Sequence, residues 1–167
     1  MSGAEQNEGM KKTLLFVLAL AVIPVGVDAQ GTAVASCADI SPSSALEDVR
    51  TCAEQGDAGA QYNLGYMYTR GGDLPEDYAE AVRWYRLAAE QGDVNAQYNL
   101  GYMYGNGDGV PEDIVFAYMW WNLAAAQGDE VAQENKDIIE QQMTRAQIAE
   151  AQRLSREWLE AHPPGGN

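Results

Sequence analysis

The chain has 167 residues, a formal net charge of −15 and a hydrophobic content of 46%. This length leaves room for one modest domain, and the hydrophobic content lies well above that of disordered chains. An acidic surface repels phosphate backbones and anionic membranes, so the charge argues against nucleic acid as a partner. A neutral or cationic partner is favoured instead.

Residues 1–29 have the pattern of a cleaved secretory signal peptide. Lys11-Lys12 form a short positive region ahead of an apolar run over 13–23, and small residues precede the expected cleavage site. The apolar run is shorter than the roughly 20 residues that span a bilayer. The pattern predicts a periplasmic or secreted protein with no stable membrane insertion after cleavage, and an uncleaved anchor is the second interpretation. Met10, beside the lysines, competes with Met1 as the start.

Residues 30–43 read as a linker, and two interpretations of Cys37 compete within it. Cys37 and Cys52 are the only cysteines, and in an exported chain they form a candidate disulfide. A closed loop of about 15 residues would stabilise the fold by roughly 3 kcal/mol. Val34-Ala35-Ser36-Cys37 also resembles a bacterial lipobox, in which the cysteine becomes the lipidated N-terminus. The two uses exclude each other.

A repeat of 36 residues dominates the rest of the chain. Residues 54–89 and 90–125 are identical at 22 of 36 positions, and a degraded third copy follows. A period in this range is typical of stacked helix pairs. We therefore predict an all-α fold, an α/α superhelical solenoid of antiparallel helix pairs over 44–161. It consists of a half-repeat cap 44–53, full repeats 54–89 and 90–125 and a degenerate unit 126–161, with a tail 162–167.

Each copy contains the signals for two helices. Gly56-Asp57 combines a left-handed helix stop with an N-cap, and the same pair recurs in both later copies. Pro75, followed by two acids, predicts that the second helix starts at the proline. Gly65 and its counterpart Gly101 fall in mid-helix, where glycine costs about 1 kcal/mol relative to alanine. Glycine at these positions predicts close approach of the partner helix.

The predicted helices each have a distinct apolar face. Projected at 100° per residue, the first helix places Tyr62 and Tyr66 opposite a stacking face that includes Leu64. Tyr78 opens the apolar face of the second helix. Trp84 and its counterpart Trp120 lie at the edge of that face as packing residues. A capping box at 144–147 starts a last helix, which closes the exposed end of the solenoid.

The repeated pattern closely resembles the Sel-one-like repeat family, relatives of the tetratricopeptide repeats. It reads Ala-Glu-Gln-Gly-Asp-x-x-Ala-Gln-Tyr-Asn-Leu-Gly-Tyr-Met-Tyr, then Gly, Pro-Glu-Asp and Ala-x-x-Trp-x-x-x-Ala-Ala, and covers 54–125. The resemblance implies a right-handed superhelix that mediates protein–protein contacts, with the first helix of each unit lining a concave groove. It thereby implies a row of partner-binding candidates for a protein or extended peptide: Tyr62, Asn63, Tyr66, Arg70, Tyr98, Asn99 and Tyr102. Packing of the tyrosines between adjacent helices is the competing interpretation.

The sequence contains no recognisable catalytic set. The only histidine, His162, lies in the tail and reads as a solvated terminal residue, and there is no Ser-x-x-Lys motif. The glycine-rich loops lack the ligand pattern of an EF-hand. We expect no enzyme activity, no cofactor and no metal. Exported relatives with a disulfide in every repeat are linked to β-lactams, so a cell-envelope hydrolase or a binding protein for a β-lactam or peptidoglycan fragment is the alternative. Neither full repeat here contains a cysteine.

Overall fold

The computed structural model describes residues 36–41 and 43–163. The expected signal peptide, both candidate start residues and the end of the tail lie outside these ranges. The chain divides into two units, Met1–Val34 and Ala35–Asn167. All the helices described below belong to the second unit, which contains the whole predicted solenoid.

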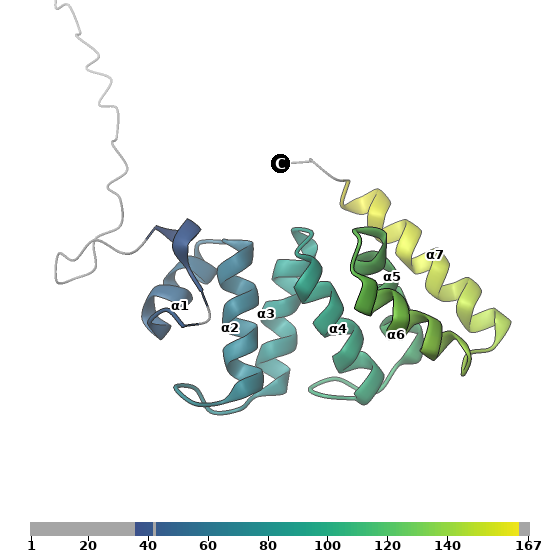
Figure 1. Ribbon diagram of the computed structural model, residues 1–167, viewed down its shortest axis with the longest axis horizontal. Coiled ribbons are helices and arrows are strands. Elements are labelled where there is room, and N and C mark those ends of the chain that lie inside the picture. The colour runs from purple at the N-terminus through teal and green to yellow at the C-terminus, as the bar shows by residue number, and fades with distance from the viewer. Residues whose placement is uncertain (1–35, 42, 164–167) are drawn as a thin grey trace, which may run out of the picture. The chain divides into compact units, whose positions relative to one another are not determined.

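The described residues form seven α-helices and one short 3-10 helix, with no strand among them. Figure 1 shows the helices following one another as a row of antiparallel pairs, which confirms the all-α solenoid. None of the helices in this part of the chain has the length and apolar character needed to cross a membrane. We call α2, α4 and α6 the A helices and α3, α5 and α7 the B helices. In chain order the elements are η1 (Cys37–Asp39), α1 (Leu46–Glu54), α2 (Ala58–Arg70), α3 (Tyr78–Glu90), α4 (Val94–Asn106), α5 (Ile114–Ala126), α6 (Glu130–Glu140) and α7 (Arg145–Ala161).

The Gly-Asp pairs end one helix and begin the next, as the sequence predicts. Gly56 has a φ of 96°, the left-handed conformation that favours glycine. The Asp57 carboxylate then accepts a hydrogen bond from the Ala60 N–H at 2.8 Å. Asp93 and Asp129 cap the next two A helices at the same distance. These caps satisfy amide groups that have no partner within the helix.

The prediction that the second helix starts at Pro75 is wrong, because α3 begins at Tyr78. Asp77 has an extended backbone, and its side chain accepts from the Glu80 N–H at 3.0 Å. Its own N–H donates to the Tyr68 carbonyl at 3.0 Å, which holds the connecting loop against the end of α2. The helix therefore starts after the N-cap Asp77, and Pro75 lies in the loop before this cap.

The two mid-helix glycines allow the paired helices to approach closely. A Cβ atom at Gly65 would lie 2.8 Å from the ring of Tyr85 on α3. At Gly101 it would lie 2.5 Å from the indole of Trp121 on α5. The Trp121 indole N–H also donates to the Tyr98 carbonyl at 3.2 Å. In each helix pair, an aromatic ring of the B helix therefore packs directly against the A-helix backbone at the glycine.

Glutamine side chains link successive repeats. Gln97 is fully buried, and its amide donates to the Ala89 carbonyl at 3.4 Å. Its oxygen accepts from the Gln127 amide of the next inter-repeat turn at 2.9 Å. Gln61 and Gln91 repeat this contact one unit earlier, at 2.8 Å. The links satisfy buried polar groups and fix the register of stacking.

The two ends of the solenoid are closed differently. At the N-terminal end a disulfide joins Cys37 to Cys52, with a Cα–Cα distance of 5.5 Å. This bond uses the sulfur that lipidation of Cys37 would require, so of the two interpretations the structure shows the disulfide. At the C-terminal end Thr144 starts α7 with the expected capping box, and α7 packs against α5.

Candidate functional site

The predicted row of partner-binding residues lies on the A helices, and part of it is used for stacking. Tyr62 is half-buried, with its ring centroid 5.8 Å from that of Tyr85. Burial raises the pKa of Tyr62, the Asp93 carboxylate adds to this, and a hydrogen bond with the Asn99 side chain lowers it. Tyr62 therefore packs against the core that includes Tyr85 of α3.

Asn63 is the member of the row with the least access to solvent. Only 5% of it is exposed, and its amide donates to the Ile40 carbonyl at 3.3 Å. The segment next to the disulfide covers this residue, which keeps it from an external partner. Tyr98 is also half-buried and packs against the core formed by α5 and α6.

Arg70 and Tyr102 are the exposed members of the row, and Tyr66 is half-buried, as are Tyr62 and Tyr98. Tyr102 is 51% exposed, and the Arg70 guanidinium lies 5.8 Å from the centroid of the Tyr66 ring. Ile138 follows Tyr102 by one repeat length and is 57% exposed. We call Tyr66, Tyr102 and Ile138 the A-helix face. Sequence reasoning missed Ile138, although the 36-residue spacing alone identifies it.

Tyr78 extends this face toward the loops, contrary to its predicted place on the buried side of α3. It is 37% exposed, because it is the first residue of the helix. The Glu76 carboxylate is the main cause of a raised Tyr78 pKa, and Asp108 and Tyr102 add to it. Glu76 and Asp108 thus give Tyr78 an acidic setting, which suits a cationic group better than an anionic one.

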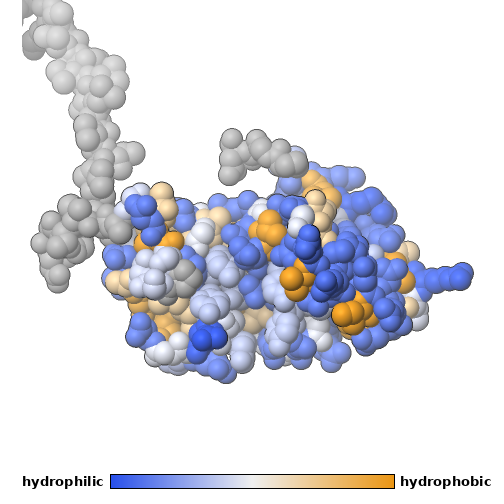
Figure 2. Space-filling view, viewed as in Figure 1, coloured by the Kyte–Doolittle hydropathy of each residue, from blue (hydrophilic) through white to orange (hydrophobic). Residues whose placement is uncertain are grey.

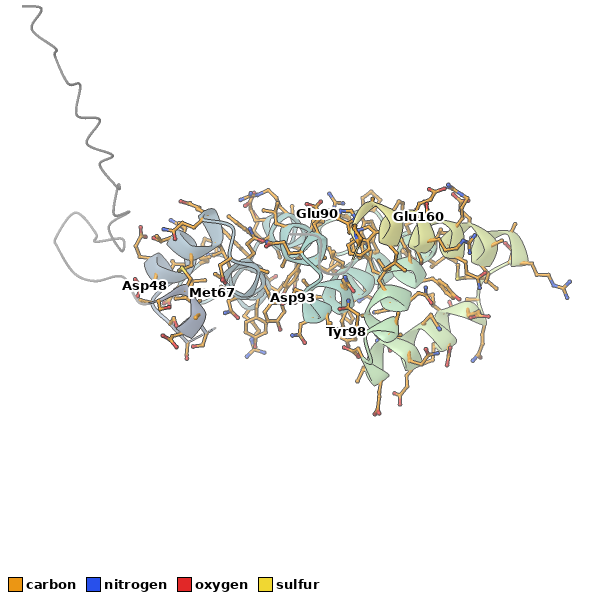
Figure 3. The ribbon with its side chains drawn as sticks, turned by 90° about the horizontal axis from the view of Figure 1, so that it is seen from above. Asp48, Met67, Glu90, Asp93, Tyr98 and Glu160 are labelled. Atoms are coloured by element: carbon orange, nitrogen blue, oxygen red, sulfur yellow. A yellow bond between two sulfur atoms is a disulfide. The ribbon has the colours of Figure 1, made fainter. Side chains whose placement is uncertain are left out.

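A pocket of about 400 Å³ is lined by residues of α3, α4, α5 and α7 and by His162. The Trp120 and Trp158 rings meet edge to face in it, with centroids 6.0 Å apart. Figure 3 shows Glu90, which lines the pocket, on one edge of the solenoid and Tyr98 toward the other. Tyr104 on α4 lines the pocket, but none of the three residues of the A-helix face does. The lining residues of the pocket are Arg86, Glu90, Tyr104, Phe116, Met119, Trp120, Leu154, Glu157, Trp158, Ala161 and His162.

The prediction that His162 is a solvated tail residue is wrong. Its ring stacks on Trp158 with centroids 4.3 Å apart, and its Nδ1 atom lies 2.9 Å from the Trp158 carbonyl. His162 therefore packs against the C-terminal end of α7, where its ring covers the ring of Trp158. Across residues 36–41 and 43–163, no three His, Cys, Asp or Glu side chains gather as metal ligands would.

No large hydrophobic patch is present on the side of the molecule seen in Figure 2. That view is mostly hydrophilic, with small separate hydrophobic patches in both halves of the solenoid. Ile138 of the A-helix face belongs to α6 and Tyr102 to α4. Both side chains are more than half exposed.

Comparisons with known proteins agree with the repeat. The family model of the Sel1 repeat matches residues 58–93 and 94–129, each spanning one helix pair. Both matches have the length of the copies 54–89 and 90–125 and begin four residues later. No curated protein showed significant similarity to the chain.

Two solved structures resemble the chain. One is a protective antigen of uropathogenic Escherichia coli that displays an SLR fold, with 36% identity, a TM-score of 0.68 and 71% of this chain covered. Another is a Sel1 repeat protein from Oxalobacter formigenes, with 37% identity, a TM-score of 0.53 and 55% covered. The chain spans only 26% and 38% of their respective lengths. Through its two matched helix pairs, the chain belongs to the Sel1 repeat family.

Proposed function

We propose that this protein is an exported, non-catalytic scaffold that binds a protein or an extended peptide on the A-helix face. The single observation that carries the proposal is the exposure of Tyr102 (51%) in register with Ile138 (57%). Most other large apolar side chains of these repeats are buried in helix packing. An exposed line of side chains at one repeat position is what a solenoid offers to a partner lying along it.

The chemistry of this face suits a protein partner. Tyrosine presents a large contact area with few rotatable bonds and a polar end, and it is enriched among residues that dominate binding energy. Asn99 and Arg70 supply polar contacts beside the tyrosines. The net charge of −15 and the acids near Tyr78 favour a neutral or cationic partner over an anionic one.

Export is supported by the disulfide between Cys37 and Cys52. Such bonds persist in oxidising compartments such as the periplasm and are rare in the cytosol. Together with the signal-like pattern of residues 1–29, the bond favours a periplasmic or secreted protein. Intact mass of the mature protein tests this point, because cleavage before Gln30 and oxidised cysteines together give one expected value.

The binding face is tested by site-specific photo-crosslinking in the native cell-envelope fraction. A photoreactive phenylalanine analogue at Tyr102 should capture one defined protein band, which mass spectrometry identifies. The same analogue at Leu159, 43% exposed on α7, is the matched control and should not capture that band. Equal capture at both positions would contradict the proposal.

A double variant tests the energetic part of the proposal. Tyr66→Ala with Tyr102→Ala should weaken binding of the captured partner at least about tenfold, because truncating an aromatic anchor costs about 2 kcal/mol or more. Helical circular dichroism should not change. Loss of helicity would instead assign the tyrosines to helix packing.

A further inference from the structure

Trp84 and Trp120 occupy the same position in the two full repeats, but different side chains lie over their rings. The Arg83 guanidinium lies 4.2 Å from the centroid of the Trp84 ring. Arg83 is itself held by Glu80 at 3.0 Å. In the second repeat, Met119 replaces Arg83. Among the described residues, no cation of the chain lies over Trp120.

Where the first repeat has an arginine, the second has the aromatic pocket. Trp120 and Trp158 form one of its walls, and Tyr104 and Phe116 stack with centroids 5.2 Å apart to form another. Trp158 belongs to α7, whose relation to α5 has no counterpart in the first repeat. The faces of aromatic rings carry partial negative charge, so such walls attract a cation.

The rim of the pocket contains acidic and basic side chains, and its one arginine already contacts a tyrosine of the same chain. Arg86 donates to the Tyr104 hydroxyl at 2.5 Å, and its guanidinium lies 5.8 Å from that ring. Glu157 pairs with Arg153. Glu90 forms no ion pair within residues 36–41 and 43–163, so its carboxylate is available to an incoming cation. The imidazole of His162 also lines the pocket, stacked on one face of Trp158 with centroids 4.3 Å apart.

We propose that this pocket binds an arginine side chain of a partner protein, in the place over Trp120 that corresponds to Arg83 over Trp84. A guanidinium is planar and weakly hydrated, so it stacks on indole while its N–H groups donate to a carboxylate such as Glu90. Its aliphatic stem suits Met119 and Leu154. The strongly acidic chain attracts basic segments toward the rim. This site lies apart from the A-helix face and does not depend on the proposed function of that face.

The test uses the full chain and three short, otherwise identical acetylated and amidated Gly-Ser peptides. The central residue is arginine, its neutral isostere citrulline, or apolar norleucine. Binding is followed by the indole N–H signals of a ¹⁵N-labelled chain, and the Trp158 signal is assigned as the one lost in Trp158→Leu. The arginine peptide should give a saturable shift at Trp158 and Trp120, and citrulline and norleucine should bind several-fold more weakly. Equal binding of norleucine would overturn the proposal, as would an absence of saturable shifts with arginine.

Two variants locate the site. Glu90→Gln should weaken arginine binding roughly two- to fivefold, since an exposed ion pair has a modest effect. Trp158→Leu should weaken it roughly three- to tenfold, read at the Trp120 signal, because the apolar volume remains and the ring face is lost. Tyr66→Ala with Tyr102→Ala is the control and should leave arginine binding unchanged. The assignment to this pocket would be overturned if Glu90→Gln left arginine binding unchanged and the tyrosine control weakened it as much as Trp158→Leu does.

Discussion

The two full repeats share 22 of 36 residues, yet the same side chain has different surroundings in each. Asn63 donates to the carbonyl of Ile40, whereas Asn99 donates to the carbonyl of Asn95 in its own helix. Trp84 lies under an arginine of its own repeat, and its counterpart lines a pocket. The first repeat follows a short disulfide-bonded cap, and the second precedes a long closing helix. The role of a residue in this solenoid therefore depends on its neighbours in the stack as well as on its repeat position.

Removal of the disulfide, which lies only beside the first repeat, should change stability more than any other test of this difference between the repeats. Reduction of the bond between Cys37 and Cys52 should lower the free energy of unfolding by about 3 kcal/mol, because the loop regains conformational entropy in the unfolded chain. Chemical denaturation with and without reductant measures the change. Hydrogen exchange should accelerate in α1 and α2 and remain unchanged in α6 and α7.

A double substitution, Cys37→Ala with Cys52→Ala, is the matched control for the reductant. Cys52 is buried, and the later repeats have alanine at its position, so alanine fits the space. The variant should have the stability of the reduced chain. A uniform rise in exchange across all helices would show that the two ends unfold as one unit, which would contradict the local role of the cap.

The next effect compares the two helix-pair contacts directly. Gly101→Ala should destabilise the fold by about 1–3 kcal/mol, because the added Cβ would meet the Trp121 indole. Gly65→Ala places its Cβ against Tyr85 with slightly more room and should cost less. Thermal or urea unfolding of both variants gives the order. Stabilisation by either variant, as alanine propensity alone predicts, would show that the aromatic ring moves aside at little cost.

A smaller effect is expected where the inter-repeat glutamines meet. Gln97→Leu should cost about 1 kcal/mol, because it removes two hydrogen bonds, from the Gln97 amide to the Ala89 carbonyl and from the Gln127 amide to the Gln97 oxygen. Gln61→Leu is the matched change one repeat earlier, at a residue that is 5% exposed, and should cost less. Urea unfolding measures both. Equal values would show that burial of the link does not matter.

Much of the fold could be predicted from the sequence because the repeat doubles every local signal. The Gly-Asp junctions, the close approach at Gly65 and the capping box of α7 each follow from conformational rules that act within a few residues. The start of α3 was missed because proline and aspartate both favour helix starts, and only the backbone of Asp77 decides between them.

The candidate site was less accessible to sequence reasoning, because exposure depends on contacts between distant segments. Projection of one helix places Tyr62 and Tyr66 on the same side, but it cannot show that Tyr62 packs against Tyr85 of α3. The projection also cannot predict that Trp158 packs against Trp120, because α7 has lost the repeat spacing that relates the other helices. Contacts between equivalent positions were predictable, and contacts made by the degenerate unit were not.

The smallest expected effect concerns the helix cap at Asp93. Burial is the main cause that raises its pKa above 3.8, and backbone hydrogen bonds from Ala96 and Asn95 oppose this shift. Between the ordinary and the raised pKa the folded chain therefore binds more protons than the unfolded chain, so this group's contribution to stability falls as pH rises from about 3.8. Asn caps a helix as well as Asp but does not titrate. The stability of the wild type relative to Asp93→Asn should thus decline as pH rises through this window, measured by urea unfolding at several pH values. Asp129→Asn makes the same change at the cap of α6 and controls for capping itself. A wild-type advantage at Asp93 that grows with pH would mean that interaction of the ionised carboxylate with the helix N-terminus outweighs its burial.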